Sequence, residues 1–483
     1  MKMEPAWATI AAIVVTVILS LVVAWKVLNS IWLRPKRLER LLRKQGLQGN
    51  PYRVLVGDVK EMLKMEKEAK SKPMTLSDDI VPRIFSFLHQ TLTKHGKNAF
   101  IWHGPKPRVI IIDPELIKDV FNNIHDFQKP IVNSNIKLLA PDLLMCEGEK
   151  WHKHRRILNP AFKLEKLKSD IISRAAFGSN YEEGERIFQL LKEHAQLTTR
   201  VVKLNYIPGW RFVSTSNRRR MKEIDGDIHA SFKGMINKRE EAMNAGEATN
   251  NDLLDLLLES NHVSIQEDGD NKNVGMTLEE VIEECKLFYL AGSETTSALF
   301  VWTMVLLSRY PHWQTIAREE VLQVFGNRSP DFDGLNQFKI VTMILYEVLR
   351  LYPPAVMLTR TVNKDMKLGK LSLPAGMHVS FPIVLVHHDC ELWGDDAKEF
   401  NPERFSEGIV KATNGQGSFI PFGGGPRICI GQNFVMLEAK MALSIILQHF
   451  SFELSPAYTH APTSGISLQP QYGAQIILHY YEI

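Results

Sequence analysis

An uncharged run of 20 residues near the amino terminus, Ala6–Trp25, constrains this chain more than any other stretch. As an α-helix, such a run spans the ~30 Å hydrocarbon core of a membrane. Trp7 and Trp25 lie at its two ends, where interfacial aromatic residues are favoured. A cleaved signal peptide has a shorter apolar region and small residues at its cleavage site, whereas this run ends in Trp25-Lys26. The run therefore predicts a membrane anchor, and a buried core helix is the alternative.

Positive charge is concentrated directly after this run. Residues 1–50 contain eight Lys or Arg residues and two Glu residues, although the net charge of the whole chain is only +4. The rest of the chain is therefore slightly acidic, which argues against a nucleic-acid-binding body. By the positive-inside rule, the cluster Arg34–Lys44 predicts that the body of the protein lies on the cytosolic side of the membrane.

The composition allows a large globular body. Of the 483 residues, 45% are hydrophobic and 23% are charged, which is enough for one large domain or two ordinary ones. The four cysteines form no CxxC pair, so neither a disulfide framework nor a zinc ribbon is indicated. The segment 387–390 reads His-His-Asp-Cys, but neighbours in an extended chain point apart, and no second ligand pair follows at a recognised spacing. No dedicated metal site is expected there.

The pattern beyond the anchor predicts a mainly α-helical body with small β-sheets. We expect a hinge at Gly46–Pro51 and a hairpin formed by Ala99–His103 and Arg108–Ile112. Amphipathic helices are expected over Tyr181–Thr198, Asn217–Met243, Phe338–Leu351 and Gln432–Gln448, and a small sheet within residues 360–385.

The longest predicted helix begins with a capping box at Thr277 and ends before Pro311. Residues 291–296 in its middle read Ala-Gly-Ser-Glu-Thr-Thr, and these small residues would permit the close approach of another body. The hydroxyl of Thr295 can bond to a preceding carbonyl. An acid beside a hydroxyl, Glu294 beside Thr295, is a candidate proton relay. The alternative is a packing notch with a solvated glutamate.

Two further patterns combine charge with apolar or aromatic neighbours. Glu347 and Arg350 lie three residues apart in an apolar helix, which favours a buried pair that needs further partners, and Arg404 is a candidate. Trp151 and Arg155 lie four residues apart and share a helix face. That face could bind a flat anionic group, and a surface cation–π pair is the alternative.

A glycine-rich loop near the end of the chain, Phe422–Gly431, contains Cys429 two residues after Arg427 and is followed directly by a helix. A cysteine before a helix amino terminus is favoured as thiolate by the amide donors and the helix dipole. Arginine supplies a forked donor for a carboxylate. The loop therefore predicts an axial thiolate ligand for a planar metal cofactor, and an inert buried cysteine is the alternative.

Four motifs stand in one order: Ala-Gly-x-Glu-Thr-Thr at 291–296, Glu-x-x-Arg at 347–350, Pro-Glu-Arg-Phe at 402–405, and Phe-x-x-Gly-x-Arg-x-Cys-x-Gly at 422–431. With the anchor and the Trp-x-x-x-Arg pattern, the chain resembles a microsomal cytochrome P-450, a haem-thiolate monooxygenase, over nearly its whole length. In detail it is similar to the plant clan that includes secologanin synthase and triterpenoid and gibberellin oxidases. Residues 46–53, 387–389 and 393–397 carry that finer likeness.

The resemblance implies a role for each candidate residue. Cys429 would be the proximal ligand to the iron of haem b. Arg427, Trp151, Arg155 and, less directly, Arg360 would bind the haem propionates. Glu294 and Thr295 would deliver protons during oxygen activation, and Glu347, Arg350 and Arg404 would form a buried network that supports the cysteine loop.

The resemblance also implies the reaction and its setting. One atom of O₂ would be inserted into a C–H bond of a small lipophilic, terpenoid-like substrate, and the other would be reduced to water. Electrons would come from NADPH through a flavoprotein reductase, for which the basic run Lys150–Arg156, with Lys153 in it, offers a docking face. A single-pass anchor in the endoplasmic reticulum membrane would leave the catalytic domain cytosolic. The substrate pocket would draw on Ile131–Leu144, Phe288–Gly292, Ala355–Leu358 and Gly465–Gln469, which are mostly apolar.

The sequence departs from the family pattern after Lys168, where about forty to fifty further residues are expected. The predicted organisation is an anchor at 1–25, a basic linker and hinge at 26–51, and a catalytic domain at 52–483 with an internal deletion near 168–170. The missing helices would leave apolar faces exposed on the helix of 278–309 and on the helix after Cys429. One alternative is therefore a non-catalytic or unstable truncated isoform that lacks part of the core helical bundle. Another is a haem enzyme of the same fold that rearranges peroxides or dehydrates without a reductase, although the Glu294-Thr295 relay counts against it.

Overall fold

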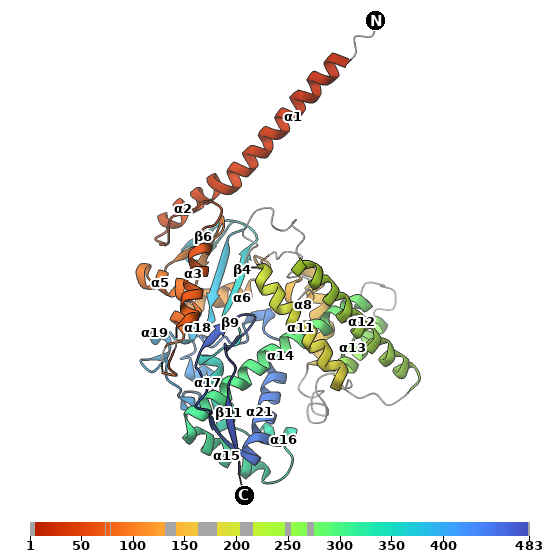
Figure 1. Ribbon diagram of the computed structural model, residues 1–483, viewed down its shortest axis with the longest axis vertical. Helices are drawn as coiled ribbons and strands as arrows, with labels where there is room; N and C mark the ends of the chain where they lie inside the picture. Colours follow the sequence, from red (N-terminus) through yellow and green to blue (C-terminus); the bar gives the residue numbers. More distant parts are fainter. Residues whose placement is uncertain are drawn as a thin grey trace.

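A computed structural model describes residues 5–72, 74–77, 79–130, 142–162, 181–202, 216–246, 253–267 and 275–481. Helix α1 (Pro5–Leu28) projects from the rest of the molecule as an isolated rod that ends in the amino terminus (Figure 1). The apolar side chains of α1 from Ile10 onward are exposed, and the helical stretch from Ile10 has a mean hydropathy of 2.5. An exposed apolar helix of this length is a candidate membrane anchor.

The anchor continues into the body without a break in the helix. A π-helical turn (Asn29–Leu33) joins α1 to α2 (Arg34–Lys44). The guanidinium of Arg34 donates to the carbonyl of Ala375 at 3.0 Å, and Leu42 is fully buried against the sheet. The segment 26–51, expected as a linker and hinge, is thus helical through most of its length and is attached to the body.

The main sheet has five strands in the order β1-β2-β7-β4-β3. Their bounds are β1 (Phe100–His103), β2 (Lys106–Ile110), β3 (Phe127–Gln128), β4 (Met357–Val362) and β7 (His378–Pro382). The β1-β2 hairpin is antiparallel as predicted, and β2 pairs with β7 in parallel. Three two-stranded sheets consist of β5 (Met366–Leu368) with β6 (Leu371–Leu373), β8 (Phe450–Leu454) with β11 (Ile476–Tyr480), and β9 (Pro462–Ser464) with β10 (Leu468–Pro470).

Helices make up most of the remainder, as predicted. The longer ones that bear on the site are α6 (Pro114–Asn122), α9 (Gly148–Ala161), α11 (Tyr181–Val202), α12 (Ser216–Asn244), α13 (Leu253–Glu267), α14 (Leu278–Arg309), α15 (Pro311–Phe325), α17 (Ile340–Leu351) and α21 (Gln432–His449). The others are α3 (Val59–Ser71), α4 (Val81–Ile84), α5 (Ser86–His95), α8 (Asp142–Met145), α16 (Phe332–Leu335), α18 (Ile383–His387), α19 (Cys390–Trp393) and α20 (Ile409–Ala412).

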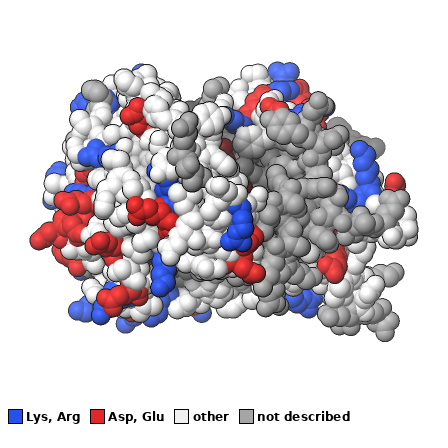
Figure 2. All heavy atoms as spheres, turned by 90° about the horizontal axis from the view of Figure 1, so that it is seen from below, with Lys and Arg blue, Asp and Glu red and all other residues white. Residues whose placement is uncertain are grey.

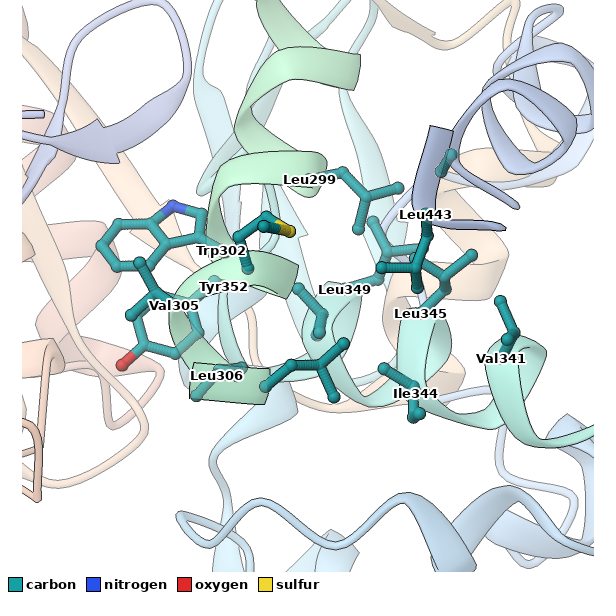
Figure 3. Close-up of a cluster of buried hydrophobic side chains, with 14 of the residues drawn as sticks. Leu299, Trp302, Val305, Leu306, Val341, Ile344, Leu345, Leu349, Tyr352 and Leu443 are labelled. Atoms are coloured by element: carbon teal, nitrogen blue, oxygen red, sulfur yellow. The ribbon is translucent and has the colours of Figure 1, made fainter. Parts of the chain in front are cut away.

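Helix α14 runs through the centre of the body (Figure 1), and its 32 residues span ~48 Å. The predicted capping box is present, because the Thr277 hydroxyl accepts from the Glu280 N–H and the Glu280 carboxylate accepts from the Thr277 N–H. Figure 3 shows side chains of α14 and α17 meeting in the core beside Leu443 of α21. There Trp302 stacks on Tyr352 with ring centroids 4.3 Å apart. The structure thus builds its core around the helix that the sequence marked as longest.

The expectation that a shortened helical bundle would leave α14 bare is not met. Within the described residues, α14 exposes no large apolar side chain, because α8, α11 and α12 contact it on one part of its surface and α15, α17 and α21 on another. Helix α13 lies against α9. On α21, Ile445 is 45% exposed, so that helix is covered less completely. Residues 163–180, around the predicted deletion, lie outside the described part of the chain.

The surface carries no single-sign charge field on the face drawn in Figure 2, where basic side chains are scattered among acidic ones and acidic side chains gather at one side. This distribution agrees with the sequence-based argument against a nucleic-acid-binding body.

Three buried histidines make the stability of the fold depend on pH. His194 on α11 and His387 are fully buried, and His388 is nearly so. Burial lowers the pKa of His194 and of His388 to about 4, and it lowers the pKa of His387 well below its ordinary value. Arg350 also lowers the pKa of both His387 and His388.

We expect the free energy of unfolding to fall as the pH is lowered from 7 to 5. The unfolded chain binds protons at these histidines below pH ~6.5, and the folded chain does not, so each contributes a loss of about 2 kcal/mol at pH 5. Urea unfolding of the detergent-solubilised protein at both pH values measures this loss. His152, which is exposed, supplies the control: H152Q should leave the pH dependence unchanged, and H194Q should reduce it. A free energy of unfolding equal at the two pH values would contradict the argument.

Candidate functional site

Cys429 lies at the end of a closed loop, between a single 3-10 turn (Gly425–Arg427) and α21. The loop is closed by the Cys429 N–H, which donates to the carbonyl of Phe422 at 3.0 Å. The thiol is accessible to solvent, but protein surrounds it on its other sides. This burial raises the pKa of Cys429 and outweighs the Gly431 N–H and the charge of Arg155, which lower it. The amide at the helix terminus therefore lowers the pKa of the thiol, as expected, but in the protein alone burial has the larger effect.

Two glycines of the loop are required by helix α6. Gly425 has φ +64°, and a Cβ there would lie 2.4 Å from the carbonyl oxygen of Phe121. A Cβ on Gly424 would lie 2.7 Å from the ring of Phe121. Because a backbone atom cannot give way cheaply, these glycines allow α6 and the loop to touch. The structure thus explains them by protein packing, without reference to a cofactor.

Arg427 and Trp151 come together as predicted. The guanidinium of Arg427 lies 4.4 Å from the centroid of the Trp151 ring, and it donates to the carbonyl of Cys146 at 3.2 Å. It also forms a close ion pair with Glu147. Arg155, one turn along α9 from Trp151, donates to the carbonyl of Ile428 at 3.1 Å. Helix α9 and the cysteine loop are therefore joined through two arginines.

Arg360 approaches the same cations from the sheet. It lies on β4, is 4% exposed, and has its guanidinium 5.7 Å from the centroid of Phe121. Its guanidinium donates to the carbonyl of Thr359 at 3.0 Å. Burial and the charge of Arg427 lower the pKa of Arg360 to about 10. A buried arginine held among other cations favours an anionic ligand.

Two charged residues near Arg360 and Arg427 were not predicted from the sequence. Lys129 follows β3, and burial together with the charges of Arg360 and Arg427 lowers its pKa to about 7. Glu147, besides its pair with Arg427, accepts a hydrogen bond from the Lys129 N–H at 2.7 Å. Neither residue belongs to a motif or to a periodic pattern, so only the three-dimensional structure reveals them.

The charges of this group fit a dianionic planar cofactor. Four basic side chains, Lys129, Arg155, Arg360 and Arg427, lie around the Cys429 loop, and within the described residues Glu147 is the one carboxylate whose charge acts on this set. The surplus of positive charge matches two propionate groups, and the thiol beside them matches an axial ligand. The residues present therefore fit a haem.

The side chains of Glu294 and Thr295 on α14 bond to different partners. Thr295 donates to the carbonyl of Ala291 at 2.7 Å, as predicted for this residue. The carboxylate of Glu294 accepts from the side-chain amide of Gln469 at 3.0 Å. Neighbours on a helix do not face each other, so the two side chains diverge. The bond to Gln469 also shows that the expected pocket segment Gly465–Gln469 lies beside α14.

The other expected pocket segments are only partly described. Phe288–Gly292 lies on the predicted long helix, α14, and Ala355–Leu358 runs into the start of β4. Most of Ile131–Leu144 lies outside the described residues.

The predicted ion pair of Glu347 and Arg350 is present and buried. Arg350 donates to Glu347 through Nη2 and Nε at 2.7 and 2.8 Å, and both side chains are fully buried. Arg350 also donates to the carbonyls of His387, Ala397 and Glu399. Every side-chain oxygen and nitrogen of the pair therefore has a hydrogen-bond partner inside the protein, which is the condition under which a buried ion pair is tolerated.

Arg404 completes this arrangement, as predicted. Its Nε lies 3.8 Å from the Glu347 carboxylate. Its two terminal nitrogens donate to Asp396 at 2.7 Å and to the carbonyl of Trp393 at 2.8 Å. We refer to Glu347, Arg350 and Arg404 as the charge lattice.

The basic run 150–156 has a different use from the one expected for Lys153. The ammonium of Lys153 donates to Glu280 at 2.9 Å and to the carbonyl of Gly275 at 3.2 Å, and so it joins α9 to the start of α14. Lys150 pairs with Glu280 at 3.3 Å. Arg156 is exposed. Lys153 is therefore a structural residue, because the amino terminus of α14 presents Glu280 to it.

The His-His-Asp-Cys segment contributes no metal site. Within the described residues, no group of three or more His, Cys, Asp and Glu could hold a metal ion. His388 instead bonds to the carbonyl of Leu351 at 2.9 Å, and Asp389 caps α19 by accepting from the Glu391 N–H.

Comparisons with known proteins find relatives over nearly the full length of this chain. The family model described as Cytochrome P450 matches residues 79–169 and 162–477. A Medicago truncatula protein named Cytochrome P450 716A67 is 56% identical, over 96% of this chain and 97% of the relative. A Glycyrrhiza uralensis protein named 11-oxo-beta-amyrin 30-oxidase is 54% identical, over 97% and 98%. A Medicago truncatula protein of the same name is 53% identical, over 99% of both chains. Coverage of nearly the full length argues against the truncated, non-catalytic alternative.

We predict that E347Q lowers the free energy of unfolding by about 3–5 kcal/mol, because it leaves the buried charge of Arg350 without its carboxylate. E68Q is the matched control: it breaks a pair with Lys64 whose side chains are 56% and 76% exposed, and it should cost less than about 1 kcal/mol. Urea unfolding measures both. Equal losses in the two variants would show that the buried pair is not a special support.

Proposed function

Since the chain belongs to the cytochrome P450 family and is a haem-thiolate monooxygenase, we propose that Cys429 is the thiolate ligand of a haem b. The observation that carries this proposal is the gathering of Lys129, Arg155, Arg360 and Arg427 beside the Cys429 loop. Such a surplus of buried positive charge is costly without an anion. A thiol and a dianion site on adjacent segments together match the two ends of haem recognition.

The propionate groups would be held by residues from three elements. Arg427 comes from the cysteine loop, Trp151 and Arg155 from α9, and Arg360 from β4. We add Lys129 to this set. Because Arg427 and Trp151 are already in contact at 4.4 Å, binding requires little rearrangement of these two side chains.

Proton delivery would use α14. When bound, the haem supplies the activation of O₂ for insertion into a C–H bond. Thr295 would hold a proton at Oγ1, where its present acceptor is the carbonyl of Ala291. Glu294 would exchange a proton with the Ser467 hydroxyl, 3.4 Å from its carboxylate, while the side-chain amide of Gln469 would hold the carboxylate in place from 3.0 Å. The two residues would therefore act at successive points of a path, with water between them.

The substrate would be a lipophilic terpenoid skeleton. Two relatives at 53–54% identity are named as oxidases of 11-oxo-beta-amyrin. The segments expected to line the pocket are mostly apolar, as an apolar polycyclic substrate requires. 11-Oxo-beta-amyrin is therefore the first compound to offer the enzyme.

The electron donor would be an NADPH-dependent flavoprotein reductase in the same membrane. The exposed apolar α1 followed by the basic α2 supports a single-pass anchor in the endoplasmic reticulum with the body on the cytosolic side. Because Lys153 is engaged with Glu280, docking would rely on exposed cations of α9 such as Arg156.

The internal deletion near 168–170 also remains our proposal. The family model matches in two pieces that meet at residues 162–169. The alignments to relatives extend over 505 to 520 positions, although this chain has only 483 residues. Both observations support a segment that the relatives contain and this chain lacks. The coverage of α14 by α8, α11 and α12 supports a body that folds without it.

We predict that C429A abolishes the thiolate-type Soret band in the reduced, carbon-monoxide-bound difference spectrum and all turnover of 11-oxo-beta-amyrin with a plant reductase. Without its sulfur ligand the haem cannot show that signature. C390A is the control, because Cys390 is exposed on α19 and should be dispensable for both readouts. A thiolate-type band that persists in C429A would refute the assignment of the ligand.

The proposed deletion can be tested with a chimera. Inserting the corresponding segment of one of the Medicago truncatula relatives after Lys168 should raise the melting temperature above that of the natural chain. The inserted helices would bury additional apolar surface, including that around Ile445. Both proteins should contain haem. An unchanged melting temperature would indicate that nothing is missing, and a natural chain without haem would revive the non-catalytic alternative.

A further inference from the structure

His387 lies between the charge lattice and the cysteine loop and contacts both. It is the last residue of α18 and is fully buried. Its Nδ1 lies 3.1 Å from the carbonyl oxygen of Arg350, and the Arg350 guanidinium donates to the carbonyl of His387 at 2.8 Å. On the other side of the ring, the N–H of Ile420 donates to Nε2 at 3.0 Å. One imidazole thus connects the carbonyl of an arginine in the lattice with a backbone amide of the loop.

The hydrogen bonds determine the protonation state of this ring. Nε2 accepts from a backbone N–H and so carries no proton, which leaves the proton on Nδ1 to be donated to the Arg350 carbonyl. Such an arrangement needs a neutral imidazole with one donor and one acceptor. Burial and the charge of Arg350 favour the same state, since both lower the pKa of His387. A protonated ring would place a donor against the Ile420 N–H.

The bond to Ile420 is the first of three that lead to Cys429. The carbonyl of Ile420 accepts from the Gly423 N–H at 3.1 Å, which forms the turn that opens the loop. The carbonyl of Phe422, within that turn, accepts from the Cys429 N–H at 3.0 Å. Ile420 therefore has both backbone groups engaged, one with His387 and one with the loop. Any shift of Ile420 moves the residue to which Cys429 is tied.

Stacking adds a second restraint on the same ring. His387 stacks on Phe419, the residue before Ile420, with centroids 5.6 Å apart and planes inclined by 21°. It also meets Trp393 edge-on at 6.3 Å. The stack prevents the ring from turning away, and the hydrogen bonds fix which nitrogen faces the loop.

We propose that His387 is the positioning residue through which the charge lattice holds the Cys429 loop in the geometry for iron ligation. This inference rests on the proposed role of Cys429. Within the described residues, no side chain of the charge lattice forms a hydrogen bond or ion pair with residues 422–431, so its influence on the thiol must pass through neighbouring groups. His387 bonds to both sides. His387 would act on the lifetime of the iron–sulfur bond and would not touch substrate or haem.

The test compares three variants of the full-length, haem-containing protein. H387F keeps a flat ring for the stack on Phe419 and removes both hydrogen bonds. H387Q keeps one donor and one acceptor in a neutral side chain. H388F is the matched control, because His388 is the adjacent buried histidine and its hydrogen bond to the Leu351 carbonyl does not lead to the loop.

The measurement is the rate at which the thiolate-type band of the reduced carbon-monoxide complex decays, recorded together with the melting temperature. We expect H387F to decay about tenfold faster than the natural protein, as follows from leaving a buried N–H of Ile420 without an acceptor. H387Q should stay within about threefold of the natural rate. H388F should lower the melting temperature as H387F does and leave the decay rate unchanged.

Two results would overturn the proposal. One is a decay rate in H387F no faster than in H388F, which would make His387 an ordinary core residue. The other is H387Q decaying as fast as H387F, which would assign the effect to ring packing and not to hydrogen bonding. C429A separates these from a failure of the proposed function, since a thiolate-type band in C429A would refute the ligand and leave the contacts of His387 without a catalytic meaning.

Discussion

The ion pair between Glu347 and Arg350 is the interaction on which the rest of the site depends. Removing two charges from water is costly, and their mutual attraction offsets that cost only when the remaining donors and acceptors are also satisfied. Here the Arg350 guanidinium reaches the carbonyls of His387, Ala397 and Glu399, and Glu347 accepts from the Asn401 N–H at 3.0 Å. Three segments that follow α17 are thereby held at fixed distances from it.

From this pair the constraints extend outward to the functional loop. Arg404 ties the pair to the turn at Trp393, and His387 ties it to Ile420. The loop is in turn pressed against α6, where Gly424 and Gly425 leave just enough space for Phe121. Cys429 therefore lies at the end of a series of contacts, each of which restricts the next. A thiol in a flexible loop could rotate away from a metal, whereas the Cys429 N–H is bonded to the Phe422 carbonyl and the neighbouring Ile428 carbonyl is bonded to Arg155.

Much of this could be predicted from the sequence because the relevant signals are local. The capping box at Thr277, the apolar run of α1 and the spacing of Glu347 and Arg350 each involve residues within a few turns of each other. The cysteine loop could be identified because glycines, an arginine and a cysteine stand in one short segment. Such patterns predicted the fold class and the candidate ligand before any contact between distant residues was known.

The remainder depends on contacts between residues far apart in the chain. Lys129 and Glu147 lie near Arg427 only because β3 and the start of α9 meet the cysteine loop. Lys153 was expected to be a free docking cation, but α14 brings Glu280 to within 2.9 Å of it. The raised pKa of Cys429 likewise results from protein packed around the thiol, which a helix-terminus argument ignores. Charge pattern alone cannot predict burial.

The anchor has a mechanical consequence for the same site. Because α1, the π-helical turn and α2 form one continuous helix, this candidate membrane anchor is joined to the body through Arg34 and the buried Leu42. As a membrane anchor, α1 would therefore restrict the orientation of the catalytic body.

In the proposed haem protein, the supported loop would hold the sulfur of Cys429 as a ligand of the iron. Iron K-edge X-ray absorption of the purified, haem-loaded ferric protein tests it most directly, because sulfur and nitrogen scatter differently at the first coordination shell. We expect one sulfur scatterer in that shell, in addition to the porphyrin nitrogens. A shell of nitrogen and oxygen alone would contradict it, since the loop would then be ordered for some purpose other than ligating the metal.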